Sequence, residues 1–162
     1  MTIPAHYVRK LNLKNDTINL THGAGGLATA QLIEEVFAKH LTNTWLDEGH
    51  DGALLPPITH PVAVSCDAHV VTPLFFPGGD IGRLAVAGTV NDVAVCGAKP
   101  LYIAATFILE EGLSLSVLDR IVQSMAETAR EAGVAVVTGD TKVVEQGHGD
   151  GIYISTTGIG EA

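Results

Sequence analysis

Hydrophobic positions along the chain follow two different periods. Apolar side chains spaced three and four residues apart predict amphipathic helices at 27–41 and 116–132. The second helix follows Ser116 and Asp119, whose spacing resembles a capping box, and it is predicted to end at Gly133. Short apolar or alternating runs predict strands at 62–67, 101–109, 134–138 and 152–157.

A third helix is predicted over 80–97, with Asp80 as its N-cap, Gly97 as its stop and Pro100 shortly after. The residues between them are apolar nearly all round, which predicts a buried helix. Asn91 and Asp92 interrupt that pattern. A buried carboxylate is costly without a partner, so Asp92 is expected to belong to a site.

From residue 62 onward the elements run strand, helix, strand, helix, strand, strand. This order predicts a single sheet with helices packed on one face. The other face is then left bare and carries Tyr102, Ile103 or Phe107, depending on register. A bare apolar face usually binds a partner, so we expect a dimer through it.

Length and composition favour one folded domain. The chain has 162 residues, 46% of them hydrophobic, with a mean hydropathy of +0.29. Residues 1–20 are polar and mixed, with a short strand near 17–20, and are expected to form a mobile segment before a domain over 21–162. The net charge of −9 argues against binding to nucleic acid or to an anionic membrane.

Two features bear on the cellular compartment. Cys66 and Cys96 lie in apolar runs and form no metal motif, so we expect buried, reduced thiols. The first residues include no hydrophobic leader, and no apolar run is long enough to span a membrane. The expected location is the cytoplasm.

Residues 22–26 form a glycine-rich loop that leads into the first helix. Backbone N–H groups in such a loop suit phosphate, and His22 lies beside them; the plainer alternative is an ordinary glycine turn that caps the helix. Lys142 would reach a phosphate or act as an acid or base, or would be an ordinary surface lysine.

Carboxylates at element ends are the other candidates. Oxygen-rich clusters hold Mg²⁺ beside nucleotide phosphates, although each aspartate on its own is also typical of a turn or cap. A simple right-handed crossover would place Asp67 and Asp92 toward opposite ends of the sheet, so spacing does not show that the group converges. The candidates are Asp51, Asp67, Asp92 and Asp140.

Several segments in one order carry a family resemblance. They include T-H-G-A-G-G, H-D-G-A-L-L, P-L-F-F-P-G-G-D-I-G, F-I-L-E-E-G-L and V-T-G-D-T-K-V-V. Over residues 20–161 the chain resembles the HypE family of hydrogenase maturation factors, in the superfamily of aminoimidazole ribonucleotide synthetase, selenophosphate synthetase and thiamine-monophosphate kinase. The resemblance implies an α+β fold with one mixed sheet, dimerising sheet to sheet into a shared barrel.

The same resemblance implies an activity. HypE-like proteins use ATP and Mg²⁺ to dehydrate a carbamoylated C-terminal cysteine to a thiocyanate, which supplies the cyanide of the [NiFe]-hydrogenase centre. Implied partners are a second copy, a HypF-like carbamoyltransferase and the HypC–HypD scaffold. HypE proteins continue into a second domain and a cysteine tail, which we expect to be absent here, so that this chain alone would not complete the dehydration.

Site residues follow from the matching motif positions. The resemblance makes Lys142 catalytic, beside the thiocarbamate, where it would remove a proton from the amide nitrogen. It makes Asp51, Asp67 and Asp92 the metal ligands. The implied nucleotide-binding residues are His22, Gly23, Gly25, Gly26, Asn91, Thr138, Gly139 and Asp140.

Two alternatives stay open at this point. The chain could be a non-catalytic dimerisation and docking module that uses no nucleotide. It could also have another activity of the superfamily, such as a small-molecule kinase or selenophosphate synthesis. The segments P-L-F-F-P-G-G-D-I-G and T-G-D-T-K count against the latter.

Overall fold

The computed structural model describes residues 10–162, and residues 1–9 of the predicted mobile segment lie outside the described part. Where a strand was expected near 17–20, Thr17 forms only an isolated bridge with Ser114. The elements run η1 Leu20–Gly23, α1 Leu27–Leu32, η2 Ile33–Ala38, α2 Lys39–Leu41, η3 Leu46–Glu48, β1 Val62–His69, β2 Phe75–Phe76, β3 Gly79–Asp80, α3 Ile81–Val95, β4 Lys99–Glu110, α4 Leu115–Ala132, β5 Ala135–Val144 and β6 Ile152–Glu161.

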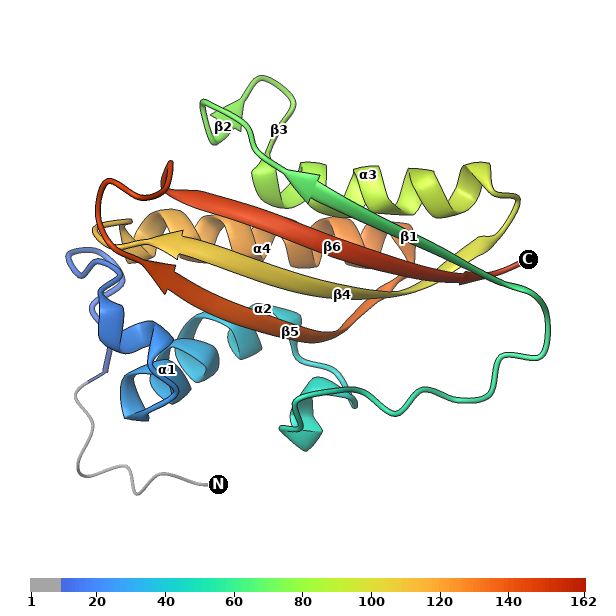
Figure 1. The fold of residues 1–162 in the computed structure, drawn as a ribbon, viewed down its shortest axis with the longest axis horizontal. Helices are drawn as coiled ribbons and strands as arrows, with labels where there is room; N and C mark the ends of the chain where they lie inside the picture. Colours follow the sequence, from blue (N-terminus) through green and yellow to red (C-terminus); the bar gives the residue numbers. More distant parts are fainter. Residues whose placement is uncertain (1–9) are drawn as a thin grey trace.

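Four strands form one mixed sheet in the order β1-β6-β4-β5. β6 pairs antiparallel with both β1 and β4, whereas β4 and β5 are parallel. Helices α3 and α4 lie side by side across one face of the sheet (Figure 1). The predicted α+β class, with helices on one face of a mixed sheet, is therefore confirmed.

Helix α3 begins where its capping chemistry predicts. The Asp80 carboxylate accepts hydrogen bonds from the backbone N–H groups of Gly82, at 2.7 Å, and Arg83, at 3.1 Å. The prediction that α3 is buried all round is wrong, because only one side of the helix meets the sheet. Leu84 and Val95 are exposed on its outer side.

Helix α4 ends at Gly133, as predicted, with that residue in the left-handed conformation at φ 68°. The predicted capping box is wrong. The helix starts at Leu115, and Ser116 shares a hydrogen bond with the Ser114 hydroxyl instead of capping the backbone. Buried side chains of α4, among them Leu118, Ile121 and Met125, form the centre of the core.

Strand β5 is longer than predicted. It was expected to end at residue 138, but it continues through Val144, because residues 138–144 pair in register with β4. Gly139 permits this pairing, since a Cβ there would lie 2.6 Å from the Ala105 carbonyl oxygen. Residues 140 and 142 therefore share one face of the sheet.

The helical segment 27–41 is present as predicted, as α1, a π-helical turn and α2 in succession. Its buried side chains, Leu32, Val36 and Phe37, join the same core. Asp119 of α4 accepts hydrogen bonds from Lys39 and His40, at 2.9 and 2.8 Å, and so fixes the end of the segment.

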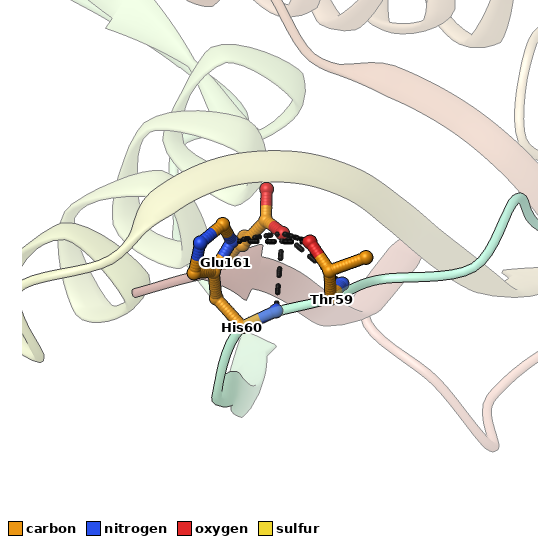
Figure 2. Close-up of polar contacts among 3 residues, drawn as sticks. All are labelled: Thr59, His60 and Glu161. Carbon is orange, nitrogen blue, oxygen red and sulfur yellow. Dashed lines mark hydrogen bonds and ion pairs between the residues drawn. The ribbon is translucent and has the colours of Figure 1, made fainter.

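The connector before β1 is tied to the end of β6. The Glu161 carboxylate lies 2.8 Å from the His60 Nδ1 and accepts from the hydroxyl of Thr59 at 3.4 Å (Figure 2). Hydrogen bonding to His60 lowers the pKa of Glu161. This contact holds the entry to β1 beside the end of the chain.

The sheet face away from α3 and α4 is open in the described part of the chain. Tyr102 lies on it, whereas Ile103 and Phe107 point into the core. Edge strand β1 adds Val64 and Cys66. The prediction of buried thiols is wrong: Cys66 and Cys96 are both exposed, the first on this open face and the second just after α3. No helix within residues 10–162 has the length and apolar character to cross a bilayer.

Candidate functional site

A pocket of about 470 Å³ lies along β5, between that strand, the glycine loop and the first helical segment. Its floor is apolar and its rim is polar, which is the usual arrangement of a small-molecule site. Apolar lining residues include Ile33, Phe37, Leu41, Leu46, Phe107 and Val136. The rim includes Gly23, Gly25, Gly26, Asp51, Thr138, Gly139, Asp140 and Lys142.

The rim on β5 carries an ion pair. The Lys142 ammonium lies 2.9 Å from one oxygen of Asp140 and 3.1 Å from the other. This hydrogen bond is the main reason that the pKa of Asp140 is lowered, with a smaller contribution from the N–H of Thr141. Both side chains are exposed, so the lysine presents a cation at the pocket mouth.

The opposite rim is built from irregular backbone. The Thr138 hydroxyl donates to the main-chain oxygen of Asp51 at 3.2 Å, which places residue 51 beside β5. Gly23 touches the strand so closely that a Cβ would lie 2.9 Å from the Val143 nitrogen. The N–H of Gly25 is already bonded to the Thr29 hydroxyl at 3.0 Å, so any phosphate would have to use other N–H groups of the loop.

His22 has a structural role in this arrangement. Its side chain is buried and its Nδ1 accepts a hydrogen bond from the Asn19 N–H at 3.0 Å. Burial is the main cause of its lowered pKa. The imidazole is not among the side chains that line the pocket, and its predicted contact with phosphate stays a prediction.

Asp67 and Asp92 form a second cluster at the other edge of the sheet. The Ser65 hydroxyl donates to Asp92 at 3.0 Å, and Ser65 and Asp67 share the helix-facing side of β1. The expectation that these aspartates lie toward opposite ends is wrong. The hairpin β2–β3 carries the chain beyond the end of β1, so α3 runs back beside that strand (Figure 1).

Exposure of this cluster differs from the prediction. Asp92 and the neighbouring Asn91 are both exposed on α3, so the argument from a buried carboxylate does not hold. Among residues 10–162, no group of three or more His, Cys, Asp or Glu side chains is arranged to hold a metal ion. Asp51 lies at the pocket, three strand spacings of about 4.8 Å from β1, so one chain does not assemble the predicted metal set.

Sequence reasoning missed three polar residues of the second cluster: Ser65, His69 and Thr156. The signal for two of them was present. Ser65 and Asp67 alternate along the predicted strand 62–67, and the same alternation continued by two residues puts His69 on that face. Burial is the largest influence on the His69 pKa and lowers it, opposed by the charges of Asp67 and Asp92.

Comparison with known proteins identifies the domain. Residues 49–162 match the family described as AIR synthase related protein, N-terminal domain. The chain belongs to this family. The match begins just before Asp51 and covers the whole sheet with α3 and α4. It includes the Asp67–Asp92 cluster and the β5 side of the pocket, whereas the glycine loop and the helical segment that line the rest of the pocket precede it.

Relatives of the AIR synthase related domain are similar over nearly the whole chain. It is 60% identical over 160 residues to carbamoyl dehydratase HypE of Cupriavidus necator, covering 98% of this chain and 46% of that protein. It is 51% identical over 150 residues to carbamoyl dehydratase HypE of Escherichia coli, covering 90% and 45%. The predicted HypE resemblance is confirmed, and the chain spans less than half the length of these relatives.

Solved structures similar to this chain also include HypE proteins. A crystal structure of hydrogenase maturation protein HypE in complex with ATP has a TM-score of 0.85 and 54% identity, covering 88% of this chain and 42% of that one. A crystal structure of a HypE–HypF complex has a TM-score of 0.61 and 55% identity, covering 80% and 42%. Thiamine-monophosphate kinase from Stenotrophomonas maltophilia has a TM-score of 0.61 and 25% identity, covering 81% and 41%.

Proposed function

We propose that this chain is the nucleotide-binding and dimer-forming domain of a HypE-like carbamoyl dehydratase. One observation carries the proposal. The pocket on β5 joins a glycine loop, Asp51 and the Asp140–Lys142 pair, in a fold that matches a HypE crystallised with ATP. The reaction would convert a carbamoylated C-terminal cysteine to a thiocyanate during hydrogenase maturation.

Mg²⁺ fits the second cluster by its donor chemistry. Asp67, Asp92 and Ser65 offer only oxygen atoms, and Mg²⁺ is typically held by one or two carboxylates together with substrate phosphates. When bound, the ion would neutralise charge on the phosphates. Asp67 and Asp92 would hold it, and the Ser65 hydroxyl would keep Asp92 oriented.

A dimer would bring the pocket of one copy next to the Asp67–Asp92 cluster of the other. We propose that two copies pack through their open sheet faces, about a two-fold axis parallel to the strands. That symmetry places the β5 edge of each copy beside the β1 edge of the other. Each site would then combine the pocket of one chain with Asp67 and Asp92 of the second copy.

Lys142 would act at the amide of the carbamoyl group. Its Nζ lies 2.9 Å from an oxygen of Asp140, so a role as base requires this ion pair to break first, with Asp140 turning toward the nucleotide. Freed from that pair and in its neutral form, the amine would take the proton from the amide nitrogen while phosphate leaves with the former amide oxygen, which forms the carbon–nitrogen triple bond. The glycine loop would cover the phosphates and exclude water.

Partners and compartment belong to the same proposal. A HypF-like carbamoyltransferase is supported by the HypE–HypF complex of a relative, and a HypC–HypD scaffold would receive the product. Two free cysteines are consistent with a reducing cytoplasm. A second candidate is a docking module without nucleotide, favoured only by the open apolar face of the sheet.

Calorimetry with Mg²⁺–ATP tests the nucleotide site. The wild-type chain is expected to bind Mg²⁺–ATP, and Asp92→Ala is expected to bind it much more weakly. Asp47→Ala, which alters an aspartate outside the pocket lining and the Asp67–Asp92 cluster, is expected to bind it like the wild type. Equal binding by Asp92→Ala would remove that carboxylate from the site. No binding by the wild type would favour the docking module.

Catalysis needs a longer protein. In a chimera that joins this domain to the remaining part of the Cupriavidus necator relative, Lys142→Ala is expected to bind ATP but form no thiocyanate, measured by mass spectrometry of the terminal cysteine. Thiocyanate formation at the unmodified rate would contradict the role of Lys142 as base.

A further inference from the structure

One buried polar group lies outside the roles assigned above. The imidazole of His69 is only 5% exposed, between β1 and α3, at the last residue of the strand that carries Asp67. A buried imidazole in contact with a carboxylate needs a reason, because polar groups are retained in cores only when their hydrogen bonds are met.

Two threonines fix the orientation of this ring. The His69 Nε2 lies 3.1 Å from the hydroxyl of Thr156 on β6, and that hydroxyl in turn bonds to the hydroxyl of Thr89 on α3. Both threonines are buried, at 1% and 0% exposure. The three side chains therefore form a continuous series of hydrogen bonds that links β1, β6 and α3.

The same nitrogen faces the metal cluster. His69 Nε2 lies 3.7 Å from Oδ2 of Asp67. A nitrogen lone pair pointing at a carboxylate oxygen would be repelled, so the proton belongs on Nε2, where it donates to the Thr156 hydroxyl. The other oxygen of Asp67 accepts the N–H of Ala68 at 2.8 Å. One carboxylate oxygen of Asp67 is therefore hydrogen-bonded, and the other lies beside the His69 N–H, beyond hydrogen-bond distance.

Helix α3 packs against His69 and Asp67 at Gly88, a residue without a side chain. A Cβ on Gly88 would lie 3.2 Å from His69 Cε1 and 3.4 Å from Asp67 Oδ2. A side chain at position 88 would crowd the imidazole, so the glycine lets His69 and Asp67 lie close to the helix backbone.

We propose that His69, oriented by Thr156 and packed under Gly88, is a positioning residue that holds the Asp67 carboxylate in place to bind the divalent cation of a nucleotide. This inference rests on the proposed function, because it needs Asp67 to be a metal ligand. His69 would act through Asp67 and would not touch the ion.

Electron paramagnetic resonance with Mn²⁺ in place of Mg²⁺, at a fixed concentration of ATP, tests the proposal on the full chain. His69→Leu and Thr156→Val are each expected to weaken Mn²⁺ binding by about tenfold or more, as loss of an outer partner of a ligand does. Thr128→Val is the matched control, because it also removes a buried threonine hydroxyl but lies on α4, away from the cluster. It should leave Mn²⁺ affinity unchanged.

A second readout separates positioning from ligation and from lost folding. The wild-type complex should show no ¹⁴N modulation from a directly bound imidazole in pulsed spectra, and His69→Gln, which keeps an N–H donor, should recover part of the lost affinity. Direct ¹⁴N coupling, or unchanged affinity in His69→Leu, would overturn the inference. If the wild-type chain binds no Mn²⁺–ATP, both the proposed function and this inference fail. If the wild-type chain binds it and the His69 and Thr156 variants bind it with the same affinity, only the inference about His69 fails.

Discussion

A charge placed on the open face of the sheet is expected to dissociate the dimer. Val64 lies on that face of β1 and keeps 64% of its surface exposed in the single chain. Fully burying a valine side chain is worth about 1.5–3 kcal/mol, so covering this residue contributes about 1–2 kcal/mol per copy. Two copies contribute about 2–4 kcal/mol to a symmetric interface.

Val64→Asp removes that contribution and adds a carboxylate that must be desolvated. The dissociation constant of the dimer should therefore rise by at least about 30- to 700-fold, at about 1.4 kcal/mol for each tenfold change. Sedimentation velocity across a range of concentrations measures it directly.

Val95→Asp is the matched control. Val95 is 84% exposed but lies at the end of α3, on the other side of the sheet. The same chemical change there should leave the dimer intact. A wild-type chain that sediments as a monomer, or a Val64→Asp chain that dimerises like wild type, would refute the sheet-to-sheet interface.

Three further predictions concern packing, pH and the shared site. Gly82→Ala should lower the free energy of unfolding by about 1–3 kcal/mol in urea titrations, because its Cβ would lie 2.3 Å from the Ile121 carbonyl oxygen, whereas Gly52→Ala, with open space around it, should be near neutral. Burial tends to raise the pKa of Asp119, but hydrogen bonds from Lys39 and His40 outweigh it, so its pKa is lowered. Its contribution to stability is then present above the ordinary aspartate pKa and is lost as pH falls through the lowered value; the stability gap between wild type and Asp119→Asn should close on acidification, and a constant gap would contradict the assignment. A mixed dimer of Asp140→Ala and Asp92→Ala chains should bind one Mg²⁺–ATP for each dimer, because one composite site stays intact; no binding would place each whole site within one chain.

Local chemistry predicted much of the fold. The cap at Asp80 and the stop at Gly133 are set by neighbours within a few residues, so their helix boundaries were predictable. Strand β5 was predicted to end at residue 138, before Asp140 and Lys142, because its pairing partner is β4, more than thirty positions earlier in the chain. Glycine in a strand is a local signal for a turn, and only the approach of the Ala105 carbonyl shows its role here.

The candidate site was predictable in its residues more than in its arrangement. The rim residues of the pocket were identified by motif, and the structure brings Asp51, Thr138, Asp140 and Lys142 together. The metal residues divide between two sheet edges, because strand order depends on contacts that no sequence spacing encodes. The prediction that Cys66 is buried was wrong for a related reason, because which face of a strand is covered depends on the layer packed against it. Cys96 is exposed because it lies at the end of α3.

A crystal structure of this chain with Mg²⁺ and a non-hydrolysable ATP analogue tests the central claim most directly. We predict a symmetric dimer in which the phosphates lie between the glycine loop and Lys142 of one copy, and the metal is bound by Asp67 and Asp92 of the other. A nucleotide seated elsewhere, or a metal bound without either aspartate, would contradict the account.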